Sequence, residues 1–148
     1  MDINEPLGRI ALFPCDDVKL LAKLCAELTE DEANDVHPTE AVLCDNISAL
    51  LSSGEVAYTF QAEGRVVGYA MVNVRRSPFY LHYFYICRDA RRHGYGTEAF
   101  HALLKTLGTS KLDLDVFVWN ERGKAFWQSL GFTPRATIMR YQADHDHN

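Results

Sequence analysis

Two arginines, a histidine and two glycines lie close together in the segment Arg91-Arg92-His93-Gly94-Tyr95-Gly96, which runs directly into a helical pattern over 97–107. The first turn of a helix leaves about four backbone N–H groups unpaired and carries roughly half a positive charge. Glycines in that turn let a diphosphate approach the backbone, and the basic side chains add further donors. The segment therefore predicts either a phosphate-binding loop or a glycine turn that only reverses the chain.

Two well-known phosphate motifs do not fit this segment. A P-loop requires Gly-x-x-x-x-Gly-Lys-Ser/Thr, and the sequence holds no such string. A Rossmann fingerprint requires a third glycine and parallel βαβ units. Position 99 is alanine, and the preceding strands read as hairpins. Both interpretations are excluded.

Hydrophobic periodicity predicts the helices and strands that must position this segment. Apolar residues at helical spacing predict helices, and β-branched and aromatic runs predict strands. We expect helices over 18–28, 43–53, 97–107 and 124–130, and strands over 9–13, 56–61, 65–74, 79–87, 112–119 and 137–141. Residues 29–40 read as an acidic connection and 143–148 as a frayed tail. The chain is predicted to be one domain over 1–148.

The composition narrows the class of protein. The 148 residues include 15 Lys and Arg against 20 Asp and Glu, a net charge of −5, which disfavours a nucleic-acid partner. No apolar run reaches the ~18–20 residues of a membrane span, and Met1–Glu5 does not resemble a secretory signal. The four cysteines form no CxxC pair, so we expect free thiols, no metal site and a cytoplasmic protein.

The glycine segment matches in register the Gln/Arg-x-x-Gly-x-Gly/Ala motif of the GNAT superfamily of N-acetyltransferases, which this sequence resembles. A second stretch is also similar to that family, through Leu114-Asp115-Val116, Asn120 and the run 126–132 with its Leu-Gly-Phe ending. The order of the expected elements agrees over nearly the whole chain. The resemblance implies an α/β fold of the α+β type. Its central sheet is mixed and mostly antiparallel, about four helices flank it, and the two central strands splay into a V.

The resemblance implies an acetyl-CoA-dependent N-acetyltransferase acting on a primary amine of a small molecule or peptide, by direct attack in a ternary complex. It places the diphosphate on the glycine loop and the pantetheine arm along the strand before it. Lys124 could reach a CoA phosphate, and a lysine that is only solvated on the helix surface is an equal interpretation. The cofactor-binding residues that it implies are Ile86, Cys87, Arg91, Arg92, His93, Gly94, Tyr95, Gly96, Thr97, Asn120 and Lys124.

The expected strand 79–86 carries no carboxylate, although the family often uses a Glu there as general base. Alternation with period two puts Tyr80, His82 and Phe84 on one face. His82 is then the candidate base, because an unperturbed imidazole has a pKa near ~6.5. The other interpretation is a histidine that only packs between aromatic neighbours.

Trp127 occupies the position where many family members have a catalytic tyrosine, and an indole N–H cannot act as an acid at neutral pH. This departure leaves an alternative function, a catalytically weak acyl-CoA-binding or sensing module. The acidic connection 29–40 is either a solvated face or a rim that attracts a cationic amine. A homodimer is compatible with the resemblance, but no residue indicates one.

Overall fold

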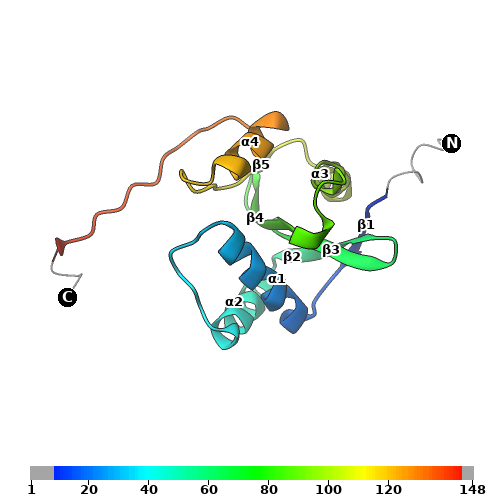
Figure 1. Cartoon of the computed structure of the whole chain (residues 1–148), viewed down its shortest axis with the longest axis horizontal. Coiled ribbons are helices and arrows are strands. Elements are labelled where there is room, and N and C mark those ends of the chain that lie inside the picture. The colour runs from blue at the N-terminus through cyan, green and yellow to red at the C-terminus, as the bar shows by residue number, and fades with distance from the viewer. Residues whose placement is uncertain (1–8, 145–148) are drawn as a thin grey trace.

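The computed structural model describes residues 9–144, which form a five-stranded sheet with helices on both faces (Figure 1). The elements follow one another as β1 (Ala11–Pro14), α1 (Val18–Asp31), α2 (Glu40–Ser52), β2 (Val56–Ala62), β3 (Arg65–Asn73), β4 (Phe79–Ile86), the short 3-10 helix η1 (Arg88–Ala90), α3 (Tyr95–Leu107), β5 (Leu112–Asp113) and α4 (Glu121–Ser129). The mixed α/β class and the four helices agree with the expectation from the sequence.

The strands lie in the order β1-β2-β3-β4-β5. The first four pair antiparallel, whereas β5 runs parallel to β4. This parallel ladder is short, because only Phe79 and Tyr80 of β4 have partners in β5. Beyond Tyr80 the two strands are no longer paired, so the sheet opens at this point as the splay predicts.

Local capping explains where the helices begin. Asp17 and Thr39 accept hydrogen bonds from the backbone N–H groups of Leu20 and Val42, at 3.2 and 3.3 Å. These contacts satisfy donors that the first turns of α1 and α2 would otherwise leave unpaired. The buried side of α1 is the stripe that the periodicity predicts, with Leu21, Ala22, Leu24, Cys25 and Leu28. Burying each leucine contributes about 1.5–3 kcal/mol.

The two faces of the sheet carry separate cores. The face under α1 and α2, here the α1/α2 face, buries residues that include Leu21, Cys25, Ile47, Tyr69, Met71 and Tyr85. The opposite face, here the α3/α4 face, buries residues that include Phe60, Val67, Val72, Leu81, Ala99 and Leu103, and Trp127 of α4 packs against it. Side chains of each strand alternate between these two cores.

Several expected boundaries are corrected by the structure. Helix α1 continues to Asp31, so the acidic connection starts later than residue 29. Strand β1 includes Pro14, which an edge strand tolerates. The strand expected over 112–119 ends at Asp113, because its ladder with β4 ends there.

The strand expected over 137–141 is wrong: these residues are extended but pair with nothing in the part of the chain that the structure describes. A strand requires a neighbour for its backbone groups, and local propensity does not supply one. Of the expected tail 143–148, only Ala143 and Asp144 lie within the described residues.

Candidate functional site

The turn between β4 and α3 has the backbone geometry of an open helix N-terminus. Gly94 is the N-cap of α3 in the left-handed region, with φ 76°, and it has no side chain to cap the first turn. Arg92 is also left-handed, with φ 70°. Arg92, His93, Gly94 and Thr97 are exposed. The N–H groups of this turn are therefore available to an anion or to water.

Gly96 lets two further elements approach this turn. A Cβ atom at Gly96 would lie 3.2 Å from the ring of Phe126 in α4 and 3.8 Å from Ile86 at the end of β4. The first contact is closer than a side chain normally makes. The structure thus brings the glycine loop, the end of β4 and α4 together. That they form one cofactor site stays a prediction of the resemblance.

Arg9 is a residue at this turn that sequence reasoning missed. Its Nε donates to Glu98 Oε2 at 2.7 Å, and its guanidinium also donates to the backbone carbonyl of His93. The same guanidinium lies 4.8 Å from the centre of the Tyr95 ring. No local pattern indicates this contact, because His93 and Glu98 follow Arg9 by 84 and 89 positions.

The Arg91 guanidinium is bound by a carboxylate of α1. Its Nη1 and Nη2 donate to the two Asp31 oxygens at 3.0 and 2.9 Å, and its Nε donates to the Ile86 carbonyl at 3.1 Å. Arg122 and Arg88 also contact Asp31. Burial raises the pKa of Asp31, but the hydrogen bonds from Arg91 and Arg122 outweigh it and hold that pKa below its ordinary value. Asp31 therefore links α1 to the site and is not part of a solvated rim.

The residues of α4 singled out by the sequence have structural partners. Asn120 is the N-cap of the helix and accepts from the Gly123 N–H at 3.0 Å. Lys124 forms an ion pair with Glu121, with Nζ 3.2 Å from Oε2. Trp127 lies edge-on to Phe84 and packs in the aromatic cluster of the α3/α4 face. Roles for Asn120 and Lys124 in cofactor binding stay predictions.

His82 is the extra residue of a β-bulge in β4. Val72 pairs with Leu81 and Met71 pairs with Tyr83, so His82 has no partner in β3. A bulge interrupts the alternation and re-aims side chains. His82 lies beside Tyr83, with ring centroids 4.6 Å apart.

The bulge corrects one expectation about the faces of β4. The sequence pattern puts Tyr80, His82 and Phe84 on the same face. The Tyr80 and His82 rings are indeed in edge contact, 5.7 Å apart. Phe84 instead packs against Phe60 on the α3/α4 face, because the bulge shifts the alternation by one residue.

Glu55 is a second residue that sequence reasoning missed. It stands between α2 and β2, its side chain is only 6% exposed, and its Oε2 lies 3.1 Å from Nδ1 of His82. Its other oxygen, Oε1, is buried without a hydrogen-bond partner among the described residues. A carboxylate beside Nδ1 favours the tautomer with a proton on that nitrogen, which leaves Nε2 as an acceptor. The signal in the sequence is a lone carboxylate directly before an apolar strand.

Carboxylates give the α1/α2 face a negative field around Tyr83. Burial raises the pKa of Tyr83, and the charges of Glu55 and Glu32 raise it further. Burial also raises the pKa of Glu32 to about 7, with a further contribution from the charge of Asp31. The end of α1 thus adds a carboxyl group that titrates near neutral pH.

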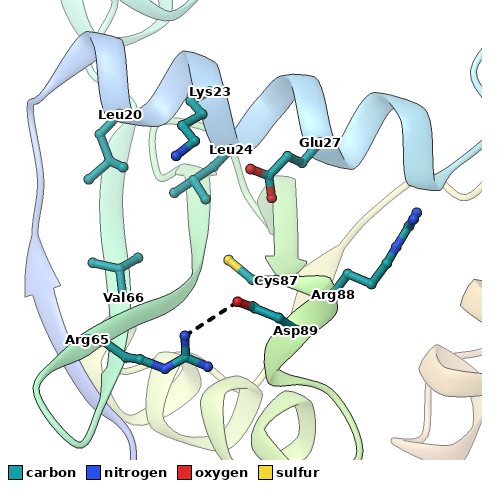
Figure 2. A pocket seen from close by; sticks show the side chains of 9 residues that line it. All are labelled: Leu20, Lys23, Leu24, Glu27, Arg65, Val66, Cys87, Arg88 and Asp89. Carbon is teal, nitrogen blue, oxygen red and sulfur yellow. Dashed lines mark hydrogen bonds and ion pairs between the residues drawn. The ribbon is translucent and has the colours of Figure 1, made fainter.

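A groove of about 380 Å³ lies on the same side of the sheet, between α1 and the ends of β3 and β4 (Figure 2). Its charged wall includes Lys23 and Glu27 of α1 and the ion pair between Arg65 and Asp89, at 3.5 Å. Cys87 also lines it, and burial raises the pKa of this thiol to about 11. The thiol therefore stays protonated at neutral pH. The groove includes neither His82 nor the glycine loop.

Among residues 9–144, no three His, Cys, Asp or Glu side chains gather as metal ligands. None of the helices in this range combines the length and apolar character that crossing a membrane requires.

Several solved structures with the same fold are described as acetyltransferases or possible acetyltransferases. A possible acetyltransferase from Clostridium difficile 630 superposes with a TM-score of 0.71 at 19% identity, over 92% of this chain and 99% of the other. Aminoglycoside N-acetyltransferase AAC(6')-Iy, solved with CoA, gives 0.68 at 14% identity, over 91% and 95%. An acetyltransferase from Thermus thermophilus gives 0.69 at 21% identity, over 84% and 86%. No curated protein sequence matches the chain.

The sequence itself matches the model of the acetyltransferase (GNAT) family over residues 18–132. This range runs from the start of α1 through Phe132 and contains the glycine loop, the bulged strand and α4. The match covers most of the chain, and the fold agrees with it independently. The chain belongs to the GNAT family of acetyltransferases.

Proposed function

We propose that this protein transfers the acetyl group of acetyl-CoA to a primary amine of a small molecule or a peptide, within a ternary complex. The observation that carries the proposal is the contact of His82 with Glu55. His82 lies on β4 directly beyond the point where β5 separates from it, and Glu55 reaches it from between α2 and β2. This position supports a role for His82 as proton acceptor beside the opened sheet. The α3 N-terminus stands at the other end of the same strand.

The backbone of β4 and of the glycine turn is suited to binding acetyl-CoA, the acetyl donor. From Leu81 to Ile86, β4 pairs with β3 on one side and has no β5 partner on the other. An extended amide-containing arm can hydrogen-bond to that free edge. At the end of the strand, the glycine-capped turn offers N–H groups to a diphosphate, and the exposed Arg92 adds positive charge. Bound acetyl-CoA would supply the thioester carbonyl that the amine attacks, with the CoA thiolate as leaving group.

His82 is suited to take the proton that an attacking ammonium must lose. Its Nδ1 is held by Glu55, so Nε2 carries the lone pair that accepts the proton. The Glu55 carboxylate then stabilises the imidazolium that forms. When it is ionised, Glu32 adds negative potential on the same face, which attracts a cationic acceptor.

Trp127 supports a second candidate function, an acyl-CoA-binding module with weak or no turnover. The indole packs against Phe84, Phe100 and Phe132 and replaces the phenol that many relatives are expected to use as acid. The leaving thiolate then has no acid at this position.

A thermal-shift titration with acetyl-CoA, free CoA, NAD and ATP tests the donor site, and an amine panel with thiol release as readout tests turnover. A ligand at about 100 times its Kd raises stability by ~2.7 kcal/mol, so a specific site is readily seen. Stabilisation by both CoA species with turnover supports the transferase. Stabilisation without turnover on any amine favours the binding module, and no response to either CoA species contradicts both.

Gly94→Val tests whether the glycine turn holds the diphosphate. A valine at this left-handed position places a Cβ 3.3 Å from Arg9 at the open turn, and we expect loss of the CoA-induced shift. Gly108→Val is the matched control, because Gly108 is also left-handed, with φ 66°, but ends the same helix in open space. Equal CoA responses in both variants would contradict a role for the turn.

A further inference from the structure

Two consecutive carboxyl groups at the end of α1, those of Asp31 and Glu32, have different surroundings. Asp31 is bound by three arginines, Arg88, Arg91 and Arg122. In contrast, the Glu32 carboxyl group has no ion pair and no hydrogen bond within the part of the chain that the structure describes. The arginines of this region thus bind one of two neighbouring acids and leave the other unpaired.

The Glu32 carboxyl group acts on the polar groups of the α1/α2 face. Burial raises the pKa of Tyr83, Tyr69 and Cys25, and the charge of Glu32 raises each of them further. The centre of the Tyr83 ring lies 4.6 Å from that of His82 and 6.0 Å from that of Tyr69. Glu32 and the proposed base His82 therefore lie near the same tyrosine, on one face of the sheet.

Two buried polar atoms near Tyr83 lack a hydrogen-bond partner among residues 9–144. They are Oε1 of Glu55 and the hydroxyl oxygen of Tyr69. The Glu55 side chain is 6% exposed, and Tyr69 is 0% exposed. Buried polar atoms are normally paired, so each of these requires an explanation. Both can accept a hydrogen bond, which means that this region is short of donors, and a ligand with N–H groups can supply them.

Trp119 adds an aromatic wall beside Glu32. Its Nε1 donates to the backbone carbonyl of Glu32 at 3.2 Å, and its ring stacks on Phe117 with 4.6 Å between centres and 8° between planes. The indole is thus held at one edge and on one face, yet Trp119 stays 50% exposed. The face of an indole attracts a cation. A carboxyl group next to a fixed indole therefore fits an alkylammonium group better than a neutral or an anionic one.

We propose that the acceptor is a diamine, with one nitrogen reacting beside His82 and the other bound as an ammonium group by Glu32. This inference rests on the proposed transferase function and names the chemical class of its acceptor. The Glu32 carboxylate supplies the opposite charge, and the indole of Trp119 supplies an aromatic surface. The two unpartnered oxygens accept further N–H groups.

Two nitrogens are required because the two positions need opposite protonation states. A nitrogen that Glu32 binds as a cation keeps its proton, so it has no lone pair for attack. The nitrogen beside His82 gives its proton to Nε2 and forms the new C–N bond with the thioester carbonyl carbon, while the C–S bond breaks and CoA leaves as the thiolate. The second ammonium group takes no part in the bond changes and only holds the acceptor in place.

The test compares putrescine, cadaverine and hexamethylenediamine with butylamine, pentylamine and hexylamine, using the full chain, saturating acetyl-CoA and thiol release as readout. We expect kcat/KM to be about 10–100-fold higher for the best diamine than for the monoamine of the same length, as a charge-assisted contact provides. In Glu32→Gln this ratio should fall close to one, mostly through KM, because the amide keeps the shape but not the charge. Glu30→Gln, on the exposed side of α1, is the matched control and should keep the full ratio.

Titration calorimetry of the same amines in the presence of CoA measures the preference without turnover. Equal kcat/KM for diamines and monoamines in the wild type overturns the diamine and leaves the transferase function standing. A diamine preference that Glu32→Gln does not change also overturns the proposal. If no amine is turned over, the transferase function fails. Calorimetric binding that is selective for diamines only when Glu32 is present then still supports the site, and non-selective binding overturns it.

Discussion

The two faces of the sheet share the same strands but have opposite chemistry. The α1/α2 face gathers polar groups, with Tyr69, Tyr83 and Cys25 in contact range and the His82–Glu55 pair beside them. The α3/α4 face is almost purely apolar, and its rings pack on one another, as Phe84 does on Phe60 and Trp127. The groups that can exchange protons thus lie on one face, beside an apolar core of its own, whereas the other face packs rings and aliphatic side chains.

A single inserted residue in β4 maintains this separation near the opening of the sheet. Leu81 and Phe84 face the apolar side, and Tyr83 and Tyr85 face the polar side. Strict alternation would put residues 81 and 84 on different faces. The bulge at His82 absorbs the extra residue and leaves the imidazole next to Glu55. The difference between the faces therefore predicts that activity and stability depend on different residues of the same strands.

The largest expected effect is a fall in kcat when a residue of the α1/α2 face is replaced. His82→Ala removes the proposed base, and we expect kcat to fall about 10²–10⁴-fold with little change in the CoA-induced thermal shift. His101→Ala, which removes an exposed histidine of α3, is the control and should leave kcat unchanged. An unchanged kcat in His82→Ala would remove this residue from the mechanism.

Glu55→Gln refines the same test, because an amide can still contact Nδ1 but cannot stabilise an imidazolium by charge. We expect kcat to fall about 10–100-fold, less than for His82→Ala, with KM for the amine nearly unchanged. Combining both substitutions should cost little more than His82→Ala alone, because the two residues act as a unit. Additive losses would contradict the coupling.

On the α3/α4 face we expect a large loss of stability and little change in kcat. Phe100→Ala removes a ring that is 4% exposed and contacts Trp127 and Phe132. The free energy of unfolding should fall by about 3–5 kcal/mol in urea titrations. The kcat of the protein that remains folded should stay near the wild-type value. A selective loss of kcat with unchanged stability would show that this face takes part in the chemistry.

How far the sequence predicts this molecule depends on how local each feature is. The glycine turn and the apolar stripe of α1 follow from neighbouring residues, and the structure has them where expected. Arg9, Glu55 and Asp31 meet their partners only through tertiary pairing, across 27 to 91 positions. The bulge is also non-local, because it is defined by the register of β3 against β4. Residues 137–141 have a strand-like sequence, but a strand also depends on a neighbour that a pattern cannot provide.

The smallest expected effect is a change of stability with pH, which Glu32 on the α1/α2 face causes. Because burial and the charge of Asp31 raise the pKa of Glu32 from 4.5 to about 7, the folded chain binds more protons here than the unfolded chain between these values. The contribution of Glu32 to stability is therefore fully present below pH 4.5 and is lost as the pH rises through 7. Discounted for partial exposure to solvent, the loss is on the order of 1 kcal/mol.

Glu32→Gln removes this titration, so the variant should be more stable than wild type at pH 8 and equal to it near pH 4, by urea unfolding. Glu30→Gln is the matched control, since Glu30 lies on the exposed side of the same helix. Its stability difference from wild type should not change in the same pH range. A difference for Glu32→Gln that is constant with pH would mean that this carboxyl is already ionised in the folded protein, and the polar face would then carry one more fixed negative charge toward its acceptor.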